Sequence, residues 1–211
     1  MTAALPRVAV VDYGLANIRS VVNALSCFDA DVTIAETGRE LGDADLIVLP
    51  GVGSFDAGME GLAARGHAEA LEHRVREAGV PYLGICLGMH FLFSGSEEGV
   101  RPGLGWLDGS IVRFPAGEGH PKVPHVGWSA VEIAASSKLM AGLASPSDLY
   151  FVHGYHAPLA RTADITTGIC EYGLRFCAAL EWENVAAVQF HPEKSQLAGM
   201  KLLETFVTRP R

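Results

Sequence analysis

Eight residues decide the fold of this chain: Tyr82-Leu83-Gly84-Ile85-Cys86-Leu87-Gly88-Met89. The uncharged run before Cys86 is typical of a buried β-strand, and the G-x-C-x-G pattern matches the tight strand-to-helix turn that carries a nucleophile, with Cys in place of Ser. Glycines beside such a turn let neighbouring segments approach where a Cβ would collide, and the start of a helix favours the thiolate. The pattern predicts that Cys86 is a nucleophile, although a buried structural thiol is the alternative that these residues alone leave open.

Other apolar runs in the first half of the chain resemble the one before Cys86. They show no alternation of polar and apolar residues and are separated by segments of helical period, which indicates parallel strands covered on both faces. The expected strands are 7–12, 32–34, 46–49 and 82–85, and the expected helices contain 18–25 and 68–78.

After Ser94 the pattern changes to short strands with turn residues between them, which is typical of an antiparallel or mixed sheet. The expected strands are 109–113, 126–133, 149–155, 175–181 and 185–189, and a final helix covers 199–207. We therefore expect an α/β fold of three αβα layers, with a mixed, mostly parallel central sheet and an antiparallel extension.

Composition excludes several classes of protein. The chain has 211 residues, 49% of them hydrophobic and 19% charged, which indicates a globular chain rather than a disordered or fibrous one. The net charge of −8 makes nucleic acid an unfavourable general partner. The uncharged segment 78–96 is interrupted by glycines and His90, so it predicts buried core and not a membrane span. We see no secretory signal and no cysteine or histidine spacing typical of a metal site, and expect a cytoplasmic protein without a cofactor.

A second candidate motif is His191-Pro192-Glu193, which follows the expected strand 185–189. In extended backbone, residues i and i+2 point to the same side, so the Glu193 carboxylate can orient the His191 imidazole. A base held by a carboxylate is what a thiol nucleophile requires. A surface turn is the better interpretation of this tripeptide in isolation, but its presence together with the Cys86 turn favours a catalytic pair.

A third motif, Pro50-Gly51-Val52-Gly53, directly follows the expected strand 46–49. Ligands of α/β sheets bind at the carboxyl ends of parallel strands, where glycines allow backbone N–H groups to face an oxyanion. An ordinary glycine-rich turn looks the same, so this motif gains weight only beside the other two.

In this order, the three motifs resemble those of the class-I glutamine amidotransferases, whose Cys-His-Glu triad hydrolyses glutamine to glutamate and ammonia. Three further segments are more specific. Together with the three motifs, they make the chain similar, over almost all of its 211 residues, to the glutaminase subunits of imidazole glycerol phosphate synthases. These segments are Asp12-Tyr13-Gly14 with Asn17 and Arg19, Pro124-His125-Val126-Gly127-Trp128, and Tyr150-Phe151-Val152-His153-Gly154-Tyr155.

The resemblance implies a flavodoxin-like fold, one catalytic domain over residues 1–211, and a heterodimer with a (β/α)8-barrel cyclase subunit that uses the ammonia in histidine biosynthesis. It implies that Cys86 attacks glutamine, His191 moves the proton and Glu193 orients His191. Oxyanion and glutamine contacts are implied for Gly51, Val52, Gly53, Leu87, His90, Gly154 and Tyr155. Contacts with the partner are implied for Asn17, Trp128 and Lys194.

The sequence departs from the family pattern at His90, where Gln is usual and contacts the substrate, and at Ser129 and Gly154. A packed histidine is as good an interpretation of His90 as a substrate contact. Three alternatives to the function stay open: the glutaminase of another synthase (anthranilate, carbamoyl phosphate or pyridoxal phosphate), a catalytically silent regulatory module, and a cysteine peptidase or γ-glutamyl hydrolase that needs no partner.

Overall fold

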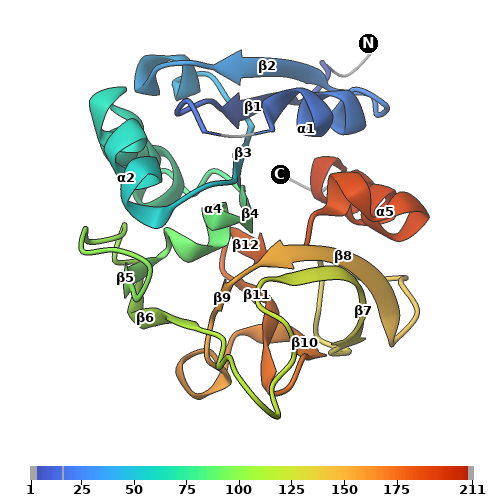
Figure 1. Cartoon of the computed structure of the whole chain (residues 1–211). Coiled ribbons are helices and arrows are strands. Elements are labelled where there is room, and N and C mark those ends of the chain that lie inside the picture. Colours follow the sequence, from blue (N-terminus) through green and yellow to red (C-terminus); the bar gives the residue numbers. More distant parts are fainter. Residues whose placement is uncertain (1–3, 16, 209–211) are drawn as a thin grey trace.

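A computed structural model describes residues 4–15 and 17–208 of the chain, and a nine-stranded sheet runs through it in the order β2-β1-β3-β4-β12-β11-β10-β7-β8 (Figure 1). The strands from β2 to β12 in this order are parallel, and from β12 to β8 each neighbouring pair is antiparallel. The parallel strands are β1 (Arg7–Val11), β2 (Asp31–Ala35), β3 (Leu46–Gly51), β4 (Tyr82–Cys86) and β12 (Val185–Val188). The antiparallel extension consists of β11 (Arg175–Trp182), β10 (Thr166–Glu171), β7 (His125–Ile133) and β8 (Ser147–His153).

Helices cover both faces of the parallel half, with α1 (Ile18–Leu25) and α5 (Gln196–Val207) on one face and α2 (Phe55–Ala64) and α3 (His67–Leu71) on the other (Figure 1). Alternate residues of β1 feed separate apolar clusters: Val8 and Val10 pack with α1 and α5, while Ala9 and Val11 pack with α2 and α3. This period of two is what a strand buried on both faces requires. The expected three-layer fold with a mixed central sheet is confirmed.

A smaller sheet of β5 (Phe93–Ser96), β6 (Leu107–Arg113) and β9 (Tyr155–His156) lies at the edge of the molecule (Figure 1). Its last strand corrects the expected strand 149–155. The chain leaves the large sheet after His153, the Gly154 carbonyl accepts a hydrogen bond from the Phe114 N–H at 3.1 Å, and Tyr155 then pairs with Arg113.

Two expected helices differ in form. The helix after Cys86 is the single turn α4 (Leu87–His90), because the Phe91 carbonyl then accepts the N–H of Leu104 and the chain turns into β5. The segment expected as one helix over 68–78 begins as α3 and continues as a wide π-helical turn over Glu72–Glu77. At the end of this turn, the Ala78 N–H donates a hydrogen bond to the His73 carbonyl. No helix within the described residues is long and apolar enough to cross a membrane.

Candidate active site

Cys86 is the last residue of β4 and directly precedes α4. Its backbone has φ 54° and ψ −106°, a strained conformation for a residue with a Cβ. The strain belongs to the turn itself, since the chain must change from extended strand to helix within one residue. The side chain is 6% exposed, so the thiol lies at the edge of the core with a small opening to solvent.

The glycines on either side of Cys86 are required by close backbone contacts. A Cβ on Gly88 would lie 1.9 Å from the Leu49 carbonyl oxygen, and a Cβ on Gly84 would lie 2.6 Å from the Gly88 carbonyl oxygen. The hydroxyl of Tyr82 donates a hydrogen bond of 2.8 Å to the same Gly88 carbonyl and so stabilises the turn. The G-x-C-x-G pattern therefore has the steric cause that the sequence suggested.

His191 follows β12, and its Nδ1 lies 2.8 Å from Glu193 Oε1. Both side chains are almost fully buried, at 3% and 1% exposure, so water hardly screens their interaction. The peptide N–H of His191 donates to the Tyr150 carbonyl at 2.8 Å, and Ser195 Oγ donates to the His191 carbonyl at 2.7 Å. These bonds orient the imidazole so that Nδ1 faces the carboxylate.

The environment of His191 favours the imidazolium form. Burial by itself lowers the pKa of this imidazole, but Cys86 and Glu193 outweigh burial and raise the pKa to about 10. Its Nε2 is buried and forms no hydrogen bond of ordinary geometry among the described residues, although the Cys86 side chain is close enough to raise the pKa. The structure thus brings Cys86, His191 and Glu193 together, from the ends of the adjacent strands β4 and β12.

The glycine-rich segment lies beside the nucleophile, because Gly51 ends β3 in register with Cys86. The Val52 N–H donates to the Leu15 carbonyl at 3.2 Å and is therefore occupied. Gly53 has φ 98°, a conformation that favours glycine. Leu87 occupies the first position of α4, where an N–H group has no acceptor within the helix.

A buried amide that sequence reasoning did not single out also contacts the sulfur. Gln189, which is fully buried, directs its Nε2 to Cys86 Sγ at 3.7 Å, while its Oε1 lies 2.7 Å from His90 Nε2. His90 is 4% exposed and burial lowers its pKa to about 4, so it is neutral at neutral pH and donates its Nε2–H to Gln189. The expected extended backbone over 191–193 is wrong: Glu193 lies in a 3-10 turn over Pro192–Lys194, and this turn brings its carboxylate to His191. Alternation therefore gave no signal for Gln189.

The remaining glutamine-binding residues expected from the sequence, Gly154 and Tyr155, follow a strand residue that approaches the nucleophile. The Val152 carbonyl is 4.0 Å from Cys86 Sγ, and Gly154 and Tyr155 follow two and three residues later, both half-buried. The Tyr155 carbonyl is 2.8 Å from His153 Nδ1.

The three expected partner contacts lie at the surface. Trp128 is 47% exposed, its ring meets Tyr150 edge-on at 5.8 Å, and Lys194 Nζ lies 5.9 Å from the centre of the same Tyr150 ring. Trp128 and Lys194 therefore share one patch around Tyr150. Asn17 is exposed at the start of α1, where its Oδ1 accepts a hydrogen bond from Ser20.

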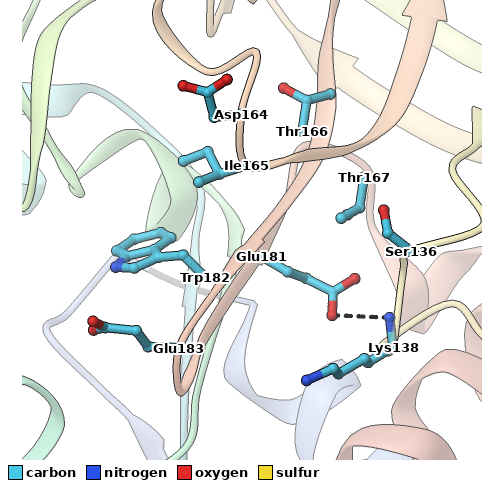
Figure 2. A pocket seen from close by; sticks show the side chains of 9 residues that line it. All are labelled: Ser136, Lys138, Asp164, Ile165, Thr166, Thr167, Glu181, Trp182 and Glu183. Atoms are coloured by element: carbon cyan, nitrogen blue, oxygen red, sulfur yellow. Dashed lines mark hydrogen bonds between the residues drawn. The ribbon is translucent and has the colours of Figure 1, made fainter.

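A pocket elsewhere in the molecule does not belong to this site. Figure 2 shows Lys138, Asp164 and Glu181 among its lining residues. It lies at the opposite end of the strands, where Trp182 pairs with Val185, the first residue of β12. Glu181 there accepts bonds from Ser137 Oγ at 2.6 Å and from the Leu139 N–H at 3.0 Å, so it stabilises a turn. Within the described residues, no group of three or more His, Cys, Asp or Glu could hold a metal ion.

Relatives of known name match almost the whole chain. A protein from Pseudomonas aeruginosa, imidazole glycerol phosphate synthase subunit HisH 2, is 40% identical over 200 residues, which cover 95% of this chain and 98% of the relative. Subunits HisH from Bdellovibrio bacteriovorus and Nostoc punctiforme are each 43% identical and cover 94% and 98% of this chain, and 98% of their own lengths.

Solved structures show the same fold at lower identity. A GMP synthase protein from Thermoplasma acidophilum has a TM-score of 0.69 at 20% identity, covering 96% of this chain and 92% of that one. PurLQS from Thermotoga maritima has a TM-score of 0.69 at 21% identity, covering 96% and 97%. The profile of the glutamine amidotransferase class-I family matches residues 9–209. With that match and the relatives above, the chain belongs to the class-I glutamine amidotransferases.

Proposed function

We propose that this chain is the glutaminase subunit of an imidazole glycerol phosphate synthase. It would release ammonia from glutamine for a (β/α)8-barrel cyclase subunit, which makes imidazole glycerol phosphate and AICAR in histidine biosynthesis. The observation that carries the proposal is the strained Cys86 turn beside the buried His191–Glu193 pair, 2.8 Å apart. Relatives that bear this subunit's name over nearly their full length support the choice of synthase. We propose further that residues 1–211 form one catalytic domain, because β4 and β12, from the two halves of the chain, are neighbours in one sheet.

In the first half-reaction, the Cys86 thiolate forms a bond to the carboxamide carbon of glutamine. His191 then gives its Nε2 proton to the amide nitrogen, the C–N bond breaks and ammonia leaves. Glu193 holds the imidazole through Nδ1 and stabilises its positive charge, which agrees with the raised pKa of His191. The product of this step is a thioester on Cys86.

In the second half-reaction, His191 takes a proton from water, and the oxygen of that water attacks the thioester carbon. The C–S bond breaks, glutamate leaves and the thiolate is restored. In both steps the negative oxygen needs N–H donors. We assign these to Leu87, at the start of α4, and to the 51–53 segment, whose Val52 N–H must first leave the Leu15 carbonyl.

The binding of glutamine and of the partner is assigned by position. Gly154 and Tyr155, which follow the strand that reaches Cys86, would contact the substrate. His90 would not contact it directly but would orient Gln189, whose amide contacts the Cys86 sulfur. Asn17, Trp128 and Lys194 would contact the barrel. Leu15, two residues before Asn17 in the sequence, accepts the Val52 N–H, and both Leu15 and Val52 are partly exposed, at 37% and 36%.

The test is the release of glutamate by the chain alone, with a barrel subunit, and with the barrel and its nucleotide substrate. We expect slow release by the chain alone and stimulation on the order of 10² when both are present, since one oxyanion donor is typically worth that much. Full activity of the isolated chain would favour a stand-alone hydrolase, and stimulation only by a different synthase would contradict the assignment.

Cys86→Ser provides the matched control. It should abolish glutamine-dependent synthase turnover, because the nucleophile is lost, and leave turnover with ammonium salts intact, because the barrel keeps its second substrate. Equal loss of both activities in a folded complex would contradict the assigned role of Cys86.

A further inference from the structure

The hydroxyl of Tyr13 is the feature of this site that the proposed reaction leaves unexplained. The side chain follows β1, is 2% exposed, and its ring packs edge-on against Phe91 with centroids 5.6 Å apart. A phenylalanine would make the same ring contact. The hydroxyl, however, is buried, and its proton has no acceptor among residues 4–15 and 17–208. A buried hydroxyl without a partner is unfavourable and calls for a physical reason.

The surroundings of this hydroxyl place it at the oxyanion segment. A Cβ added to Gly51 would lie 2.4 Å from the Tyr13 oxygen, 2.7 Å from Leu87 Cβ and 3.2 Å from the Gly88 nitrogen. The Tyr13 hydroxyl therefore meets the last residue of β3 and the first turn of α4 at one point. Burial, and next the charge of Cys86, raise the pKa of Tyr13, so the hydroxyl stays protonated and can donate.

The peptide between Gly51 and Val52 has its N–H turned to the Leu15 carbonyl at 3.2 Å. To offer that N–H to an oxyanion, the peptide must rotate, and rotation exchanges the places of its N–H and its carbonyl. After the rotation, the Gly51 carbonyl faces the side of the Leu15 carbonyl. Both groups are acceptors, so no hydrogen bond can form between them. The same side holds the Tyr13 hydroxyl, close enough to Val52 that its N–H acts on the pKa of Tyr13.

We propose that Tyr13 is a positioning residue whose hydroxyl donates to the Gly51 carbonyl once this peptide has rotated. In the resting arrangement the Val52 N–H approaches the hydroxyl oxygen, but the hydroxyl proton has no acceptor among the described residues. In the rotated arrangement that proton is donated to the Gly51 carbonyl, and both groups are satisfied. The Tyr13 hydroxyl thereby shifts the equilibrium toward the arrangement that stabilises the oxyanion. The inference rests on the proposed function, because rotation matters only if the oxyanion segment serves glutamine hydrolysis.

The experiment compares Tyr13→Phe with the wild type, each in complex with the barrel and in the presence of its nucleotide. We expect kcat for glutamate release to fall about tenfold and KM for glutamine to stay within twofold, because the hydroxyl acts on the oxyanion donor and not on substrate binding. The urea midpoint of the isolated variant should be unchanged or higher, because an unsatisfied buried hydroxyl has been removed.

Tyr82→Phe is the matched control, since Tyr82 is also a buried tyrosine but its hydroxyl already donates to Gly88 at 2.8 Å. Its loss leaves a carbonyl unpaired, so the urea midpoint should fall. A wild-type kcat in Tyr13→Phe, or a fall in its urea midpoint like that of Tyr82→Phe, would overturn the assignment. If the wild type itself is not stimulated by the barrel, the proposed function fails instead, so the two failures are distinguishable.

Discussion

At the scale of single residues, the sulfur of Cys86 is contacted by more than the triad. Gln189 directs an N–H group to it, and His90 holds that amide in place, because an Nε2–H donor can bond only to the amide oxygen. His90 therefore stabilises the thiolate through the orientation of Gln189. Its lowered pKa of about 4 moves its titration below the range of pH 5–8 that an ordinary histidine would suggest.

We predict that Gln189→Leu slows the alkylation of Cys86 by iodoacetamide at pH 7, since a donor to the thiolate is lost. His90→Leu should have a smaller effect in the same direction, because the Gln189 amide is then free to turn. His90→Gln should restore the wild-type rate, because its NH₂ group can donate in place of the imidazole. The measurement is made in a Cys27→Ser background, since Cys27 is exposed whereas Cys170 and Cys177 are buried.

The comparison of these variants separates orientation from packing. Equal rates in Gln189→Leu and the wild type would show that the 3.7 Å contact does not stabilise the thiolate. A His90→Gln rate as slow as that of His90→Leu would show that the shape of the imidazole, and not its donor, matters.

At the scale of elements, the turn between β4 and α4 depends on glycines that carry no chemistry. We predict that Gly88→Ala lowers the melting temperature by about 5 °C or more, since overpacking typically costs 1–3 kcal/mol and this Cβ meets backbone 1.9 Å away. Gly95→Ala in β5 is the control, because the nearest atom to its Cβ would be 3.5 Å away. Similar melting temperatures for the two variants would contradict the steric account.

Glycine also explains which elements the sequence did not reveal. Helix α2 contains Gly58 and Gly61, which weaken its helical pattern, yet a Cβ at Gly58 would lie 2.3 Å from Phe91 and one at Gly61 2.3 Å from the Tyr13 carbonyl. Glycine is required at both positions because a Cβ would collide, and only the folded structure shows these close approaches. The strands β5 and β10 were missed for the related reason that long-range pairing, and not a local pattern, defines them.

The residues of the candidate site also fall into two groups, those that a local motif reveals and those that only the folded structure reveals. The meeting of Cys86, His191 and Glu193 was predictable because each lies in a short motif that follows an expected strand, although Glu193 lies in a 3-10 turn and not in the expected extended backbone. Tyr13 and Gln189 were not singled out, because their roles depend on contacts between segments far apart in the chain. The engagement of Val52 by Leu15 is of the same kind.

At the scale of the whole molecule, burial of histidines links stability to pH. His90, His125, His153 and His156 are each at most 6% exposed, and burial lowers the pKa of all four, with a value of about 4 for His90 and His125. His125 is stacked on Tyr172 at 3.9 Å and on Phe151 at 4.7 Å, and its Nδ1 lies 3.0 Å from His153 Nε2. These rings are packed as neutral groups in the core.

The sign of the effect follows from the two pKa values of each group. An unfolded histidine takes up a proton near pH 6.5, whereas the folded His90 and His125 stay neutral down to about pH 4. Between these values the unfolded state binds more protons. The contribution of each histidine to the free energy of unfolding is therefore fully present above pH 6.5 and decreases as the pH falls. His191 has the opposite sign: its pKa of about 10 stabilises the fold at neutral pH, and that contribution is lost as the pH rises through 10.

We therefore predict that the free energy of unfolding, from urea titrations, falls between pH 7 and pH 5 by about 2 kcal/mol for each of His90 and His125. His125→Phe should be less stable at pH 7, because His153 loses a partner, but its stability should depend less on pH. His90→Gln tests the same slope if His125→Phe does not fold. His120→Asn is the control, because His120 is exposed and its substitution leaves the buried rings in place. A slope in both core variants equal to that of the wild type would mean that these rings accept protons in the folded state, and the packing of a neutral histidine core would then be wrong.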